Sequence, residues 1–164
     1  MTKGNEKIND LVTKEKKYIT FTLEKERYGV EIKYVDRVLG FVEISKVPDL
    51  PDYFEGVVKY DGKDIPVIDL RRKYINRGVD ISEGSFVIVT EVKNRMLGLL
   101  VNSVSEVLYL NEKDIKPATN CESLFGNDSL KGITMKNNVT NVLVDIEKIL
   151  TKRDIDFIDK FNLS

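Results

Sequence analysis

Short runs of aliphatic, β-branched and aromatic residues alternate with polar turns along most of this 164-residue chain. Such runs, bounded by glycine, proline and acidic residues, are typical of β-strands. The pattern predicts strands at 18–23, 28–32, 56–60, 65–70, 86–90, 96–101, 132–135 and 142–146. Many short strands at regular spacing predict a mostly β fold of the barrel or sandwich class.

Three places carry a different pattern. The apolar positions Val35, Val38 and Leu39 fit either a helical turn or a bent strand. Residues 151–164 continue a helical spacing of apolar positions, so we expect a C-terminal helix there. Pro66 has no N–H group, and its strand is therefore expected to lie at a sheet edge or to carry a bulge.

Two parts of the chain repeat the same apolar pattern. The matched segments are 28–39 with 97–108, at an offset of 69, and 56–70 with 132–146, at an offset of 76. Short apolar patterns also coincide by chance, but two matched blocks in the same order favour a duplication. A duplication predicts two similar small β-barrels. These should share one core, because each half is too small to hold a robust core alone.

Composition and charge exclude several kinds of chemistry. The 26 basic and 27 acidic residues give a net charge of −1, which offers no electrostatic argument for binding nucleic acid or an anionic membrane. The absence of histidine excludes Ser-His-Asp and Cys-His catalysis and every zinc site that uses histidine. The single cysteine, Cys121, excludes an intramolecular disulfide and is interpreted as an exposed spectator thiol. Without a secretory or membrane-spanning segment, the expected location is the cytoplasm.

Two aspartates at strand ends are the candidates for catalysis. Asp69 and Asp145 each follow an apolar strand, where a carboxylate can act as a general acid or base. Alternatively, each caps the following turn or helix by accepting a backbone N–H. Their equivalent positions in the two repeats favour capping, because a duplicated structural residue recurs by descent. No phosphate-binding glycine loop or metal-ligand spacing accompanies them, so neither a cofactor nor a metal is expected.

Arg37 and Asp61 form a second candidate pair. Both lie in the first half of the chain, and a barrel that brought them together would allow a bidentate ion pair. Two unrelated surface charges explain the pattern equally well.

A longer set of motifs extends over residues 18–150. The motifs are F-T-L at 21–23, Y-G-V at 28–30, G-V at 56–57 and P-V-I-D-L-R at 66–71. Residues 86–110 and 131–150 fit the second half of the same family pattern. In this combination the chain resembles the CheW-type chemotaxis coupling proteins.

The resemblance implies a non-enzymatic scaffold of two five-stranded, SH3-like β-barrel subdomains that share a hydrophobic core. These subdomains would be interleaved within 17–150, after a disordered polar arm at 1–16 and before the C-terminal helix at 151–164. The implied partners are the cytoplasmic hairpin of methyl-accepting chemoreceptors and the regulatory domain of a CheA-type histidine kinase. The protein would be cytoplasmic and held at membrane-bound receptor arrays through these partners, with no membrane insertion, nucleic acid or cofactor.

The resemblance also implies contact residues. Carried over by motif position, the receptor contacts are Val35, Gly56, Asp61, Phe86, Val104 and Gly132. The kinase contacts are Phe41, Val42, Ile44, Val47 and Pro48. At Arg37 and Asp61 the chain departs from the family, whose residues there carry the opposite signs. We therefore expect these two residues to form a structural ion pair of reversed polarity.

Two other functions stay open at this stage. One is a scaffold, or a regulatory-domain homologue, in a signalling system other than chemotaxis. The other is a small β-barrel enzyme that uses Asp69 and Asp145.

Overall fold

The computed structural model describes residues 15–40, 42–75, 85–119 and 125–162. The predicted kinase contact Phe41, the cysteine Cys121 and most of the predicted arm at 1–16 lie outside these ranges. The first strand, β1, begins at Lys16.

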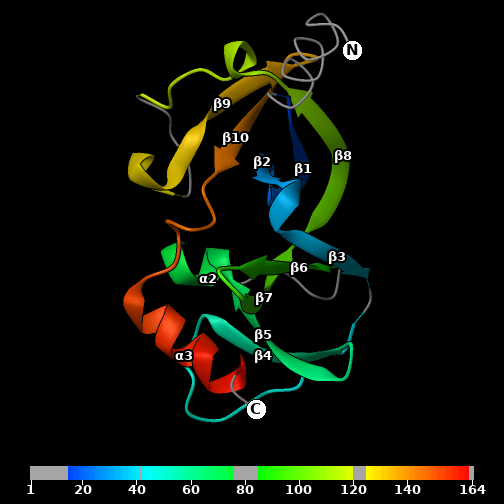
Figure 1. The fold of residues 1–164 in the computed structure, drawn as a ribbon, viewed down its shortest axis with the longest axis vertical. Coiled ribbons are helices and arrows are strands. Elements are labelled where there is room, and N and C mark those ends of the chain that lie inside the picture. The colour runs from blue at the N-terminus through cyan, green and yellow to red at the C-terminus, as the bar shows by residue number, and fades with distance from the viewer. Residues whose placement is uncertain (1–14, 41, 76–84, 120–124, 163–164) are drawn as a thin grey trace, which may run out of the picture.

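Ten strands form two five-stranded sheets, one above the other in Figure 1. In spatial order, the upper sheet contains β8 (Ser103–Leu110), β1 (Lys16–Leu23), β2 (Glu26–Glu31), β10 (Val139–Val144) and β9 (Leu130–Lys136). The lower sheet contains β3 (Val35–Gly40), β6 (Phe86–Val92), β7 (Arg95–Val101), β5 (Lys63–Asp69) and β4 (Phe54–Tyr60). All neighbouring strands are antiparallel except β2 with β10 and β5 with β7.

The two sheets exchange strands between the halves of the chain. The upper sheet joins β1 and β2 to β8, β9 and β10, and the lower sheet joins β6 and β7 to β3, β4 and β5. The parallel pairs that connect the halves place Gly29 opposite Leu143, and Gly98 opposite Val67. A Cβ atom at Gly29 would lie 3.0 Å from a methyl group of Leu143, and one at Gly98 would lie 3.2 Å from a methyl group of Val67. The repeated glycines therefore leave room for side chains of the other half of the chain in each sheet.

The fold class agrees with the prediction except that the ladders do not close into complete barrels. In each sheet of the described residues the two outer strands share no ladder. Side chains connect the outer strands of the lower sheet: the Tyr60 hydroxyl on β4 donates to Asp36 on β3 at 2.5 Å. A short bridge between Ser45 and Val57 also ties the segment after β3 to β4.

One hydrophobic core serves both sheets. Its fully buried members include Val67, Ile88 and Leu100 from the lower sheet. Phe21 and Val30 from the upper sheet belong to the same cluster. A shared core is consistent with the expectation that neither half buries enough apolar surface alone.

The helices are short and lie mostly at strand ends. They are η1 (Ile32–Tyr34), α2 (Leu70–Ile75), η3 (Glu112–Asp114), η4 (Asn127–Ser129) and α3 (Lys152–Asn162). The ambiguous segment after β2 contains both alternatives, the turn η1 followed by strand β3. The C-terminal helix is confirmed, whereas α2 falls in a stretch interpreted as the end of a strand and a polar connection.

The expected edge position of Pro66 is wrong, because β5 pairs with β4 on one side and with β7 on the other. Pairing with β7 begins one residue later, at Val67, so the missing N–H group interrupts no pair with β7. The register with β4 is irregular between Phe54 and Gly56, but the extra residue lies on β4 and Pro66 pairs directly with Val57, so the alternative of a bulge on the Pro66 strand is wrong as well.

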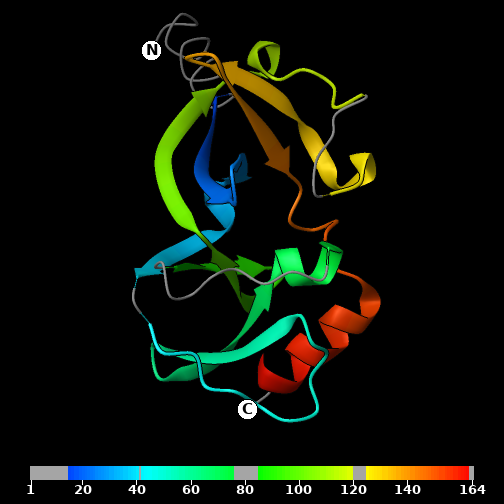
Figure 2. The same cartoon turned by 180° about the vertical axis from the view of Figure 1, so that it is seen from behind.

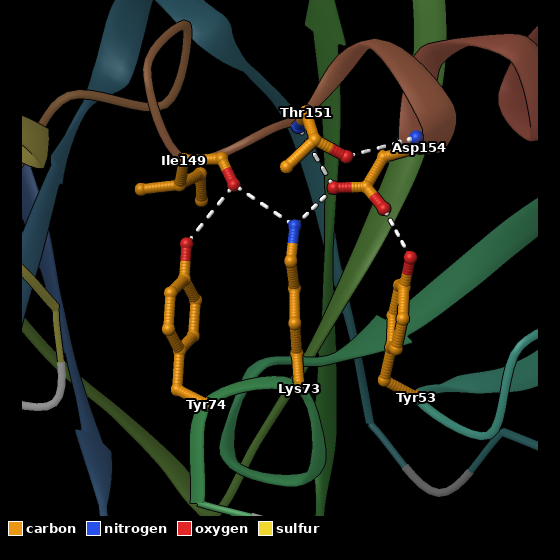
Figure 3. Close-up of polar contacts among 6 residues, drawn as sticks. All are labelled: Tyr53, Lys73, Tyr74, Ile149, Thr151 and Asp154. Atoms are coloured by element: carbon orange, nitrogen blue, oxygen red, sulfur yellow. Dashed lines mark hydrogen bonds and ion pairs between the residues drawn. The ribbon is translucent and has the colours of Figure 1, made fainter.

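A buried ion pair attaches α3 to α2 (Figure 3). Lys73 of α2 contacts the Asp154 carboxylate on α3 and donates a hydrogen bond to the Ile149 carbonyl at 3.0 Å. The Tyr53 hydroxyl donates to the same carboxylate. Thr151 and Asp154 cap the helix reciprocally, since each backbone N–H donates to the other's side-chain oxygen, at 2.9 and 3.2 Å. Asp154 is fully buried and all of its carboxylate contacts lie within the protein.

Candidate interaction surface

Both strand-end aspartates cap the backbone. Asp69 Oδ1 accepts from the Arg71 and Arg72 amides at 3.0 and 3.3 Å, and Asp145 Oδ1 accepts from the Glu147 amide at 3.1 Å. Asp69 ends β5 of the lower sheet, and Asp145 directly follows β10 of the upper sheet. These hydrogen bonds confirm the capping interpretation.

The backbone around these aspartates repeats as well. The Asp69 amide donates to the Tyr53 carbonyl, and the Asp145 amide donates to the Ser129 carbonyl, both at 2.8 Å. Each partner precedes its aspartate by the same number of residues, so one local structure occurs twice. Within the part of the chain that the structure describes, no cluster of three metal-ligating side chains occurs.

The predicted receptor contacts lie on five strands and one turn. Val35, Phe86 and Val104 are half-buried on β3, β6 and β8, Asp61 is exposed in the β4–β5 turn, and Gly56 and Gly132 are buried on β4 and β9. The three half-buried apolar residues pack against the main core from outside. They are therefore supported by the core and remain partly exposed to solvent.

The two glycines of this set have a local structural role. Gly56 and Gly132 have φ angles of +143° and +149°, which side chains rarely adopt. An added Cβ atom would lie 2.1 Å from the Ser45 carbonyl oxygen in one case and 2.5 Å from the Lys116 carbonyl oxygen in the other. Each glycine thus lets a neighbouring segment bridge to the edge of its sheet.

The predicted kinase contacts lie on the segment that connects β3 to β4. Val42, Ile44 and Val47 are half-buried and Pro48 is exposed. Val42 and Ile44 pack against the core, which fixes the segment along the lower sheet.

Arg37 and Asp61 both act on Tyr60. The Arg37 guanidinium lies 6.0 Å from the centroid of the Tyr60 ring. The hydrogen bond to Asp36 is the largest cause of the raised pKa of the Tyr60 hydroxyl, which the charge of Arg37 opposes and that of Asp61 supports. The ion pairs found among the described residues do not include one between Arg37 and Asp61, and their pairing stays a prediction.

A cluster of charges around Glu31 was not predicted from the sequence. This buried carboxylate at the end of β2 lies 3.1 Å from Lys131 Nζ, 3.2 Å from Lys33 Nζ and 3.7 Å from Lys16 Nζ. Burial by itself would raise the pKa of Glu31, but hydrogen bonds and charge from Lys131 and Lys33 lower it below its usual range. We call Glu31 and its three lysines the Glu31 cluster.

The charge of Glu31 also affects the pKa of the buried Tyr18 hydroxyl. Burial, followed by the negative charges of Glu31 and Asp145, raises the pKa of Tyr18 to about 12. The only hint of the cluster in the sequence is an acidic residue at the end of an apolar strand. Lys33 is close to Glu31 in the sequence, but Lys16 and Lys131 come from positions that only the fold brings together.

Comparison with known proteins identifies the family. The model of the CheW-like domain matches residues 17–154, which include every strand except the first residue of β1. The chain belongs to the CheW-like family. The fold class and the resemblance inferred from the motifs are confirmed, and this CheW-like chain is a chemotaxis scaffold rather than an enzyme.

Several relatives of this CheW-like chain cover nearly the same length. The chemotaxis protein CheW of Klebsiella aerogenes is 33% identical over 142 residues, covering 87% of this chain and 86% of the relative. That of Thermotoga maritima is 28% identical over 137 residues, covering 84% and 89%. The crystal structure of the scaffolding protein TtCheW from Thermoanaerobacter tengcongensis superimposes with a TM-score of 0.68 at 31% identity, covering 79% of this chain and 88% of that one. Among the described residues of the CheW-like chain, no helix has the length and apolar character needed to span a membrane.

Proposed function

We propose that this CheW-like chain couples the cytoplasmic hairpins of chemoreceptors to the regulatory domain of a CheA-type histidine kinase. The observation that carries the proposal is the family match across both sheets and their shared core. Coupling needs no catalytic group, only a rigid body with two separate binding surfaces. The protein would act in the cytoplasm, at receptor arrays that it reaches through its partners.

The receptor surface of this proposal contains Val35, Phe86 and Val104 with the exposed Asp61. Half-buried apolar side chains fixed against a core can accept the apolar face of a helix with little loss of side-chain entropy. Gly56 and Gly132, the other two predicted contacts, belong to the same proposed surface and shape the edges of β4 and β9.

The kinase surface contains the connecting segment with Val42, Ile44, Val47 and Pro48, and the neighbouring Phe41. Its described residues lie along the lower sheet, where the Ser45–Val57 bridge fixes the segment against β4. A kinase regulatory domain of similar fold could pack its own sheet edge against this segment. The contacts of one copy can be weak, because many copies in an array increase the effective concentration.

Binding to purified fragments tests both surfaces. The purified chain should bind a receptor hairpin fragment and a kinase regulatory domain simultaneously. We expect Val47→Asp to weaken kinase binding by about tenfold or more, since a charge would be buried in an apolar contact, and to leave receptor binding unchanged. Val139→Asp on β10 is a matched control, because this valine is also partly exposed.

If the purified chain binds neither the receptor hairpin fragment nor the kinase regulatory domain, the coupling function is contradicted. Kinase binding without receptor binding would favour a scaffold in another signalling system. If Val47→Asp and Val139→Asp change the affinity for the kinase domain equally, the connecting segment is not part of the kinase surface.

A further inference from the structure

The Glu31 cluster holds more positive charge than its carboxylate can balance. Three lysine ammonium groups lie within 3.7 Å of Glu31, two of them on the same oxygen. Lys16 and Lys131 are consequently less than about 7 Å apart, a distance at which like charges repel appreciably. One anion neutralises one cation, so the cluster has a formal charge of +2 on a chain whose total charge is −1.

The acid and the lysines of this cluster differ in how far they are buried. The Glu31 side chain is 5% exposed, whereas those of Lys33 and Lys16 are 59% and 47% exposed. A molecule that approaches this site therefore meets ammonium groups, with the carboxylate beneath them. Lys33 is further fixed by its position 5.1 Å from the centroid of the Tyr34 ring.

The surrounding charges cancel only part of this excess. The Asp145 carboxylate, whose charge acts on Tyr18 together with that of Glu31, reduces it from +2 to +1 when it is counted with the cluster. Glu31 itself already binds two lysines through hydrogen bonds. An additional carboxylate could bind Lys33 and Lys16 at their exposed ends without displacing any contact.

The lysines of the cluster adjoin the proposed receptor surface. Lys33 lies two residues before Val35, and Lys131 immediately precedes Gly132. The cluster joins β1, η1 and β9, and η1 leads directly into β3 of the lower sheet.

We propose that Lys33, Lys131 and Lys16 form a basic recognition site for an acidic side chain on the receptor hairpin. The inference rests on the proposed coupling function, and it assigns part of the receptor specificity to the positive charge of these lysines. Buried Glu31 orients the lysines, and the receptor carboxylate completes their charge balance. Recognition of this kind contributes mainly to specificity and to the rate of association, and it weakens as salt increases.

The test measures affinity for a receptor hairpin fragment in low and high salt. Lys33→Gln and Lys131→Gln should each weaken binding by about threefold to tenfold at about 0.05 M salt, and the loss should shrink to under about twofold at about 0.5 M salt. Lys33→Arg, which keeps the charge, should bind like the unchanged chain. Lys152→Gln is the matched control, because Lys152 is exposed at the start of α3 and outside the cluster.

Two further measurements separate recognition from folding. Affinity for the kinase regulatory domain and the thermal unfolding midpoint should stay unchanged in Lys33→Gln, whose side chain is mostly exposed. A double-mutant cycle should show coupling between Lys33 and at least one acidic residue of the hairpin, each changed to its amide.

The possible outcomes distinguish this inference from the proposed function. If the unchanged chain binds the hairpin but Lys33→Gln and Lys131→Gln bind with the same affinity and salt dependence, the recognition site is overturned and coupling stands. An equal loss of kinase binding would reveal a general structural effect and also overturn it. If the unchanged chain does not bind the hairpin at all, both proposals fail together.

Discussion

The molecule contains two clusters in which lysine side chains form ion pairs with a buried carboxylate. The clusters differ in the exposed fraction of those lysine side chains. Around Asp154, the Lys73 side chain is 10% exposed and the carboxylate is fully buried, with Tyr53 and Thr151 completing its hydrogen bonds (Figure 3). Around Glu31, the acid is also buried, at 5% exposed, but Lys16 and Lys33 face solvent. The first arrangement is closed and the second can accept another charged group.

This difference follows from what surrounds each acid. Asp154 is fully buried on α3, where it contacts Lys73 of α2 and Tyr53, the residue before β4. Figures 1 and 2 show α3 next to α2 at the side of the lower sheet. Glu31 lies at the end of β2, where the chain leaves one sheet for the other. Removing one partner from a closed cluster leaves the other charge buried and unpaired, whereas lysines that face solvent can bind another anion.

Removal of the acid from the closed cluster should have the largest effect. Asp154→Asn leaves Lys73 buried without a counter-charge and should lower the free energy of unfolding by about 3–5 kcal/mol. Urea denaturation measures the change. Asp156→Asn, on the exposed side of the same helix, is the control and should change stability by less than about 0.5 kcal/mol. Similar results for both variants would show that the ion pair contributes little.

Acid should weaken both clusters. Burial by itself would raise the pKa of Asp154, but Lys73, Tyr53 and the Thr151 amide lower it below 3.8, and the lysines lower that of Glu31 below 4.5. A carboxylate whose pKa is lower in the folded state stabilises the protein above its unfolded pKa. This contribution is lost as the pH falls through the folded value. Unfolding free energies measured between about pH 2 and pH 6 should therefore fall with acid, and less steeply in Asp154→Asn. An unchanged slope would contradict the lowered pKa of Asp154.

The same substitution in the open cluster should cost less. Glu31→Gln removes the anion, but Lys33 and Lys16 can turn into solvent, so we expect a loss of only about 1–2 kcal/mol. Differential scanning calorimetry at neutral pH can compare it with Asp154→Asn. A loss as large as that of Asp154→Asn would show that Glu31 is primarily structural.

The helix cap should make a smaller contribution. Thr151→Ala removes one half of the reciprocal cap and leaves the Lys73–Asp154 contact in place, so we expect a loss of about 1 kcal/mol. Thr151→Ser keeps the hydroxyl and serves as the control. Urea denaturation of the two variants checks the difference, and equal stabilities would contradict the cap.

Lys33→Gln should have the smallest effect on stability. An exposed lysine in an ion pair typically contributes under about 1 kcal/mol. Its thermal unfolding midpoint should match that of the unchanged chain. A clear drop would assign Lys33 a structural role in place of recognition.

Much of the fold could be predicted because strands and turns leave local signals. Alternation of apolar and polar residues located most of the strands, and the repeated spacing correctly matched Asp69 with Asp145 as caps. Helix α2 was missed because six residues are too few to show a clear helical period. The edge position expected for Pro66 was wrong because a strand's neighbours are set by topology and not by its own residues.

The sequence by itself determined the element types, the duplicated pattern and the family, since these depend on local periodicity and on motifs that a single chain displays. Only the tertiary structure decided that the halves exchange strands and that Lys16, Lys33 and Lys131 gather around Glu31. Contacts between residues far apart in the chain arise from packing the two sheets on one core, and no local pattern records them. The Glu31 cluster is therefore visible in the fold and not in the composition.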